Sequence, residues 1–293
     1  MELDYVKLKQ IKPAISGYIR KSQILLKKSG IPDENAVHDI RVLMKKSRAL
    51  LKLAAPQLDK TYFERNITEL REAGRIMSNW REASVQRRII KDLKKENADL
   101  FSMHSENRVL TFLQERQKTP NEVVEDINKA VEQINSLLNK TGFRIRFEPM
   151  NMIEPKLLIK ELEKSYIEIS DLYLCCRNNP KPSKLHKLRR KSKDFLYQLL
   201  IFRPLNPIVI KALEKKLDRM TQDLGKFNDL AQLIQSSGYF YKMEDNDPAV
   251  DELIVKVREK QDKYLSKVWP VAYKIFCPGQ NLVNILGFKL LVI

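Results

Sequence analysis

The chain has 293 residues, enough for one large domain or for two domains of about 150 residues. It contains 54 lysines and arginines against 37 acidic residues, and the net charge of +17 exceeds what solubility requires and suits phosphate-rich partners. Residues 1–150 carry 29 basic and 20 acidic side chains (+9) and residues 151–293 carry 25 and 17 (+8), so we expect the charge to belong to the folded body and not to a basic tail.

Helices are predicted in both halves, since only 8 glycines occur and long stretches rich in Lys, Glu, Leu and Ile recur. In the first half the expected helices run from Val6 to Lys28, from Asn35 to the residue before Pro56, from Lys60 into the 70s, over 84–116 as one or two helices, and from 119 to Leu138. After a break at Lys140–Gly142, apolar and basic residues alternate over Phe143–Phe147, which predicts a short strand.

The second half restarts near Glu154–Pro155 and repeats this order. The expected helices run from there to Cys176, from a turn and cap at 178–183 to Pro204, from Ile208 to Gly225, from Asn228–Asp229 onward, and over 249–268. The tail from Pro278 to Ile293 is apolar but too short to cross a bilayer, so we expect it to pack or to be poorly ordered. The predicted fold class is all-α.

A basic stripe follows the start of the second predicted helix. His38, Arg41, Lys45 and Arg48 lie at offsets of 0, 3, 7 and 10 residues, so on a helix they share an arc of about 80°. Lys52 extends the run. The apolar residues of the same segment form a separate arc that faces the core, namely Ile40, Leu43, Met44, Leu50, Leu51 and Ala54. The only acid between His38 and Lys52 is Asp39, so the stripe is not neutralised within its own helix.

A second stripe lies 148 residues later and consists of His186, Arg189, Arg190 and Lys193. Its apolar arc is Leu188, Phe195, Leu199 and Phe202. A further pair of similar segments, Met77–Glu82 and Leu224–Asp229, is separated by 147 residues. Two motif pairs at nearly equal separation indicate an internal duplication. Arginine binds phosphate oxygens with two parallel donors and lysine adds a mobile charge, so the paired stripes predict a site for a repetitive polyanion.

These motifs resemble the CHAD family, the conserved-histidine α-helical domain, over roughly residues 5–240. The first copy, His38-Asp39-Ile40-Arg41-Val42 followed by Lys45, Lys46 and Arg48, fits closely. The second copy departs at Asp194 and Leu196, which remove positive charge from that helix. The Leu224–Asp229 segment matches the common Leu-Gly-x-x-Asn-Asp, and in the first copy Ser78 and Glu82 stand in place of Gly and Asp, so Ser78 has to tolerate the backbone geometry of the usual glycine.

The resemblance implies a single domain, 1–293, made of two related four-helix halves around a pseudo-two-fold axis with a basic central groove or pore. The boundaries we expect are 5–118 for the first half, 119–153 for a connecting segment, 154–275 for the second half and 276–293 for the tail. The implied ligand is inorganic polyphosphate, bound without turnover. The candidate binding residues are His38, Arg41, Lys45, Arg48, Lys52, His186, Arg189, Arg190 and Lys193, with Arg81, Lys215 and Arg219 as weaker candidates.

Each of these residues taken alone also has a simpler, structural interpretation. A lone histidine on a helix is usually a structural hydrogen-bonding group, and a charge run is usually a solvated face; only their recurrence favours binding, and His104 lacks such a context. Gly225, Asn228 and Asp229 are best interpreted as a helix junction and cap. The alternative functions are low-specificity RNA or DNA binding, binding of shorter anions such as inositol phosphates, and, least favoured, an enzyme acting on phosphorylated substrates.

Catalytic and metal-binding motifs are not found in the sequence. It has no P-loop, no Gly-x-Gly-x-x-Gly, no Glu-x-Glu-x-Lys motif of a fused CYTH domain and no metal-spaced cluster, so we expect no enzyme, cofactor or metal. Cys175 and Cys176 are adjacent and Cys277 is far away, which does not support a disulfide framework. The first residues lack the order of a signal peptide and no stretch approaches about 18 apolar residues, so the expected location is the cytoplasm. The resemblance to the CHAD family further implies association with polyphosphate granules.

Overall fold

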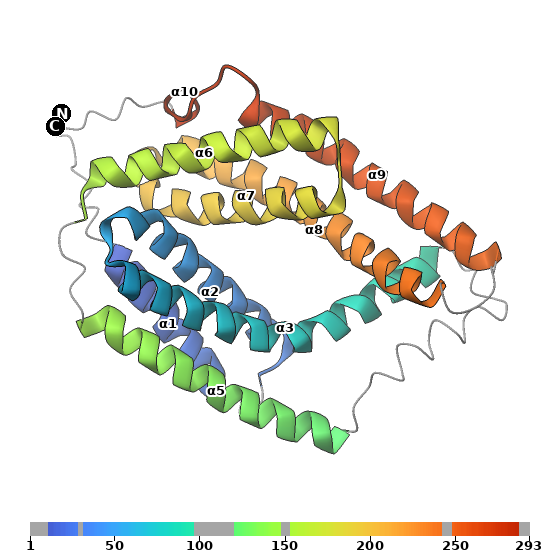
Figure 1. The fold of residues 1–293 in the computed structure, drawn as a ribbon, viewed down its shortest axis with the longest axis horizontal. Helices are drawn as coiled ribbons and strands as arrows, with labels where there is room; N and C mark the ends of the chain where they lie inside the picture. The colour runs from blue at the N-terminus through green and yellow to red at the C-terminus, as the bar shows by residue number, and fades with distance from the viewer. Residues whose placement is uncertain (1–10, 29–31, 97–119, 148–152, 242–247, 287–293) are drawn as a thin grey trace.

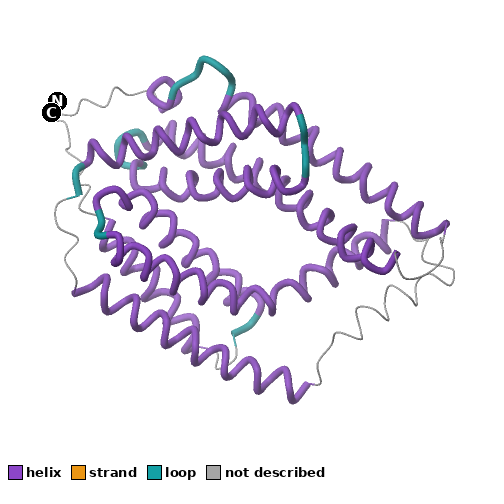
Figure 2. Tube along the Cα trace, in the orientation of Figure 1, coloured by secondary structure: helices purple, strands orange, loops and turns teal. Residues whose placement is uncertain are grey.

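The computed structural model describes residues 11–28, 32–96, 120–147, 153–241 and 248–286. All regular elements in these ranges are helices, and Figure 2 shows no strand among them. The predicted all-α class is therefore confirmed. No helix within the described ranges is both long enough and apolar enough to span a membrane.

The first group of helices consists of α1 (Ile11–Lys28), α2 (Glu34–Ala54), α3 (Lys60–Glu96) and α5 (Pro120–Phe147), with a short 3₁₀ turn, η2 (Ala55–Gln57), after α2. Asp33 caps α2 by accepting a 2.6 Å hydrogen bond from the backbone N–H of Ala36. Within the group α1 packs against α2 and α5, and α3 packs against the same two helices (Figure 1). We call this group the first half.

The second half consists of α6 (Pro155–Asn178), α7 (Pro182–Phe202), α8 (Pro207–Tyr241) and α9 (Pro248–Phe276), followed by the short α10 (Leu282–Leu286). A proline at the start of each of α6–α9 suits the first turn, where the missing N–H has no helical partner to lose. Consecutive helices pack in the order α6, α7, α8, α9, and α9 returns to α6. The halves meet chiefly where α2 packs against α7, with smaller contacts between α2 and α6 and between α3 and α8.

The predicted strand at Phe143–Phe147 is wrong, because α5 continues through it to Phe147. Tertiary contacts explain the difference. Thr141 donates a 2.7 Å hydrogen bond to the Glu69 carboxylate of α3, and Arg144 forms an ion pair with the same carboxylate. Ile145 is buried, so this turn is held against α3 in helical form. The segment 119–153, expected to connect the halves, thus contains a helix that packs against α1 and α3.

A further prediction is corrected by the length of α8. This helix continues through the repeated signature, so Gly225, Asn228 and Asp229 lie inside α8 and do not form a junction or a helix cap. Of the tail, α10 packs through the buried Leu282 and Leu286, while 287–293 lie outside the described residues. The expected helix start at Val6 and most of the 84–116 segment also lie outside them.

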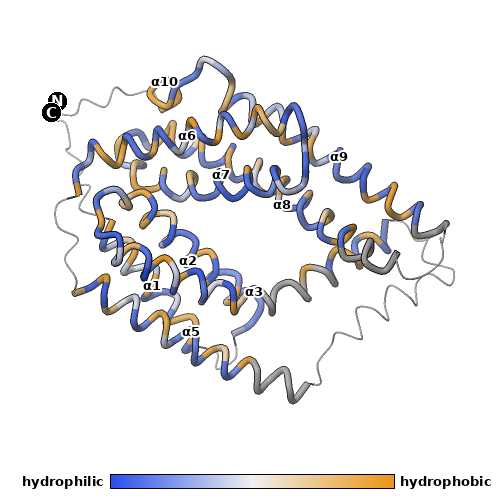
Figure 3. The backbone as a smooth tube through the Cα atoms, in the orientation of Figure 1, coloured by the Kyte–Doolittle hydropathy of each residue, from blue (hydrophilic) through white to orange (hydrophobic). Residues whose placement is uncertain are grey.

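The predicted apolar arcs of the stripe helices form part of the core. In α2 the side chains of Ile40, Met44, Leu50, Leu51 and Ala54 are at most 1% exposed, and Leu43 is half-buried. In α7 the same holds for Leu188, Phe195, Leu199 and Phe202. Figure 3 shows this division of each helix into apolar and polar faces. Since the buried arc fixes the rotation of each helix, it also fixes the direction in which the basic stripe faces.

Candidate anion site

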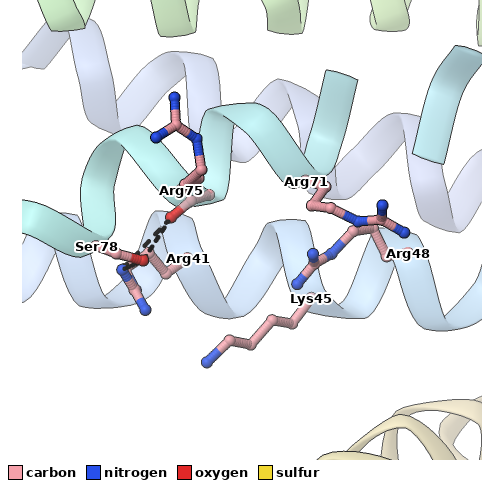
Figure 4. A pocket seen from close by; sticks show the side chains of 7 residues that line it. Arg41, Lys45, Arg48, Arg71, Arg75 and Ser78 are labelled. Carbon is pink, nitrogen blue, oxygen red and sulfur yellow. Dashed lines mark hydrogen bonds between the residues drawn. The ribbon is translucent and has the colours of Figure 1, made fainter. Parts of the chain in front are cut away.

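A cavity of about 220 Å³ lies between α2 and α3 in the first half. Figure 4 shows the side chains that enclose it. They come from three positions of the first stripe and from one face of α3, and they are Arg41, Lys45, Arg48, Arg71, Gly74, Arg75 and Ser78. Five of these seven residues are cationic and none is acidic. We call this cavity the first-half pocket.

Arg48 and Arg71 place two guanidinium groups next to each other in the first-half pocket (Figure 4). Burial is the main effect on Arg48 and lowers its pKa. The nearby Asp194 carboxylate raises this pKa, whereas the charges of Arg71 and Arg190 lower it. The Nε of Arg48 is buried, and no hydrogen-bond partner for it occurs among the described residues. Neither guanidinium group forms an ion pair with a carboxylate of the described residues, and an anion bound between them would be attracted by both charges.

Arg41 is held at the other end of the pocket by α3. Its Nη1 donates a 2.6 Å hydrogen bond to the Ser78 Oγ and a 3.4 Å one to the Gly74 carbonyl, while Ser78 donates to the same carbonyl at 3.1 Å. Arg75, which is exposed, instead forms a bidentate pair with Glu72, with N···O distances of 2.9 and 2.7 Å. The pocket thus contains Arg41 hydrogen-bonded to α3, Arg75 in an ion pair with Glu72, and the two neighbouring guanidinium groups of Arg48 and Arg71.

The equivalent arginine of the second half, Arg189, is anchored differently. Its Nε donates a 3.1 Å hydrogen bond to the Thr221 carbonyl of α8. A Cβ added at Gly225 would lie 3.0 Å from that Nε and 3.1 Å from Nη2, closer than most Cβ contacts. The glycine therefore makes room for a guanidinium group. Its backbone is ordinary α-helix, because Gly225 lies within the continuous helix α8. Ser78, at the matching position of α3, is helical too and therefore does not need to adopt a glycine-like backbone conformation.

An acid pairs with one cation of the second stripe. The Lys193 ammonium forms a 2.7 Å ion pair with the Asp218 carboxylate, whose other oxygen accepts a 2.6 Å hydrogen bond from Gln222. Asp218 lies 147 residues after Arg71, so the second half has a carboxylate at the position where the first half has a guanidinium group. The two stripes therefore differ in the charge of the helix opposite them.

The stripes come together where α2 meets α7. Lys52 forms a 2.6 Å ion pair with Asp194, and Gln198 donates a 3.2 Å hydrogen bond to the Ala49 carbonyl. Burial lowers the pKa of His186, and Arg189, Arg190 and Lys45 lower it further, so cations of both stripes act on one imidazole. The acidic residue at position 194 therefore does more than remove a positive charge from α7, because it forms an ion pair with a lysine of the other half.

The remaining predicted residues are spread over the surface. His38 and Arg190 are exposed on α2 and α7, and Lys215 and Arg219 are exposed on α8. Arg81 lies in α3, where its side chain is not among those described, and His104 lies outside the described residues. The prediction missed Arg71 and Arg75. Their positions relative to Ser78, at spacings of 7 and 3 residues, put all three on one face of α3, and that spacing was the signal available in the sequence.

The family model of the CHAD domain matches residues 21–236, a stretch that contains both stripes and both repeated signatures. The chain therefore belongs to the CHAD family. No curated protein matches it.

Proposed function

We propose that this CHAD-family protein binds inorganic polyphosphate through its two basic stripes and does not turn it over. The observation that carries the proposal is the first-half pocket, in which five cationic side chains and no acid surround a cavity between α2 and α3. Guanidinium groups suit phosphate because their N–H donors match pairs of phosphate oxygens, and lysines add charge without a fixed geometry. A polymer of phosphates supplies one such partner after another.

The position of the second stripe supports a ligand that extends beyond the pocket. Arg190 contributes to the electrostatic field at both Arg48 and His186, and Lys45 contributes at His186. A chain that leaves the first-half pocket past Lys45 would therefore meet His186, Arg189 and Arg190 of α7. Binding would release condensed counterions, so the affinity should fall with salt at a slope of about 0.7 per phosphate engaged, as for single-stranded nucleic acid.

Calorimetry with long-chain polyphosphate at two salt concentrations tests this function. The variant to compare with the wild type carries Arg41→Ala, Lys45→Ala, Arg189→Ala and Lys193→Ala. A matched control removes four exposed lysines of α6 and α9, namely Lys156, Lys160, Lys256 and Lys263, and so has the same net charge. We expect tight, salt-sensitive binding by the wild type and the control and its loss in the stripe variant. Equal binding by the two variants would contradict the proposed site.

Nucleic acid is the alternative ligand, and the exposure of aromatic side chains near the stripes helps to distinguish it from polyphosphate. Single-strand binders stack bases on exposed rings. Tyr197, beside the second stripe, is buried, with the Lys46 and Lys193 ammonium groups each 5.9 Å from its ring centroid. Its ring is thus packed inside and offers no platform to a base. We expect polyphosphate to displace RNA from the protein, and retention of RNA would favour the nucleic-acid alternative.

The absence of turnover is tested separately. Polyphosphate recovered after long incubation with the protein, with and without divalent metal, should have an unchanged chain length on a gel and no released phosphate. Shortened chains that require the intact stripes would replace binding by catalysis as the function.

A further inference from the structure

We infer that the first-half pocket is a receptor for the terminal phosphate group of a polyphosphate chain, so that the ligand is held by one end at α2 and α3 while its interior runs along the second stripe. This inference rests on the proposed function and adds a direction and a preferred group to it.

The end group of a polyphosphate chain differs from its interior phosphates in charge. An interior phosphate of the chain carries one negative charge, whereas an end group resembles a phosphate monoester with a charge of about −1.5 to −2 at pH 7. The first-half pocket gathers five cationic side chains around about 220 Å³. Among the described residues, Arg75 forms an ion pair with Glu72, whereas Arg48 and Arg71 form none, and Arg48 has only the longer-range attraction of Asp194. The Arg48–Arg71 pair therefore gains most from a group that brings two negative charges to one point.

The end group also differs from the interior phosphates in its number of acceptors. An end group presents three non-bridging oxygens and an interior phosphate presents two. The pocket is lined by the neighbouring guanidinium groups of Arg48 and Arg71 and by the guanidinium of Arg41, whose position Ser78 fixes. Donors that converge from α2 and from α3 match a group with more acceptors on a single phosphorus atom.

The second half has the opposite character at the matching positions. Leu196 replaces Arg48, Asp218 replaces Arg71 and Gln222 replaces Arg75. The Asp218 carboxylate, already bound by Lys193 and Gln222, would repel a doubly charged phosphate more than a singly charged one. The second stripe thus suits interior phosphates, and the two halves together define the direction of the chain.

Two small phosphates separate end recognition from attraction by charge alone. Linear tripolyphosphate has two ends, whereas cyclic hexametaphosphate has none but carries more negative charge. We expect wild-type protein to bind tripolyphosphate at least about tenfold more tightly than the ring, as measured by calorimetry. Replacing the exposed Arg71 by alanine should reduce this ratio to about one, whereas Lys156→Ala, which removes one exposed lysine of α6 outside the stripes, should leave it unchanged. Equal or tighter binding of the ring by wild-type protein would overturn the inference.

A second measurement uses long-chain polyphosphate whose two ends are capped as phosphoramidates, which changes the total charge very little. We expect capping to weaken binding at least about fivefold. If capping has no effect while the stripe variant still loses binding, end recognition is wrong and the proposed function stands. If long-chain polyphosphate binds no better to wild-type protein than to the stripe variant, the proposed function itself fails.

Discussion

The two halves of this protein place similar helices around different charges. Arg41 and Arg189 occupy matching positions, and each donates a hydrogen bond to the helix that follows its own, Arg41 to Ser78 and Arg189 to the Thr221 carbonyl. However, Arg71 of α3 lines the same pocket as Lys45, whereas Asp218 of α8 forms an ion pair with Lys193. The comparison shows that cationic side chains at the same sequence spacing on two helices can have different electrostatic surroundings. A cationic residue becomes available to a ligand only where its neighbours do not neutralise it.

The largest expected effect comes from removing the Arg48–Arg71 pair. Each charge-assisted hydrogen bond to phosphate contributes about 1.5 kcal/mol or more, so Arg48→Ala with Arg71→Ala should weaken polyphosphate binding about 100-fold. The matched second-half variant, Arg190→Ala with Lys193→Ala, should weaken it only about fivefold, because Asp218 already holds Lys193. Calorimetry on both variants, with circular dichroism to verify helicity, makes the comparison. Equal losses would mean that the halves contribute alike.

Asp218→Asn tests whether the acid is what makes the second half weaker. The substitution removes the carboxylate that pairs with Lys193 and leaves an amide that can still bond to Gln222. We expect polyphosphate affinity to rise about tenfold and the salt dependence to steepen, because one more cation becomes available to the ligand. An unchanged affinity would show that Lys193 does not reach the ligand even when it is released.

Gly225→Ala separates stability from binding. Alanine improves the propensity of a helix interior by about 1 kcal/mol, so the melting temperature should not fall. The new methyl group would push the Arg189 guanidinium away from its present position 3.0 Å from the added Cβ, and we expect polyphosphate affinity to fall about threefold. Thermal denaturation and calorimetry on one preparation give both values. A lower melting temperature with unchanged affinity would indicate a purely structural role for Arg189.

Asp194→Asn loosens the contact between the halves. The Lys52–Asp194 pair is only partly exposed, and its loss should lower the free energy of unfolding by about 1 kcal/mol or less. The melting temperature should fall by a few degrees at low salt and by less at high salt, since salt screens the pair. The same destabilisation at both salt concentrations would mean that packing of the side chain, and not its charge, joins α2 to α7.

His186 gives the smallest expected effect, a dependence on pH. Its pKa lies below the ordinary value, first because of burial and then because of Arg189, Arg190 and Lys45. The unfolded chain therefore binds more protons than the folded one, so stability falls as the pH drops below the ordinary value of 6.5. His186→Gln should reduce the difference between melting temperatures measured at high and low pH. Bound polyphosphate should reduce it too, because an anion favours the protonated imidazole.

Part of the fold and of the candidate site could be predicted from the sequence alone. The helical periodicity of α2 and α7 was sufficient to place the core arc on one side and His38, Arg41, Lys45 and Arg48 on another, and the duplicated spacing identified the second stripe. The prediction of a strand at Phe143–Phe147 was wrong because it used only the local alternation of residues. The helix there is stabilised by contacts of Thr141 and Arg144 with Glu69, which lies 72 residues before Thr141 and 75 before Arg144.

The sequence by itself determined the helical class, the family, and which faces of α2 and α7 are basic, since all of these depend on residue type and short-range spacing. Only the tertiary structure decided which cations share a pocket and which are neutralised. Arg71 joins Arg48 while Asp218 binds Lys193, and Lys52 binds Asp194 across the halves. The physical reason is that electrostatic energy depends on distances between side chains on different helices, and helix packing, not the periodicity of any one segment, sets those distances.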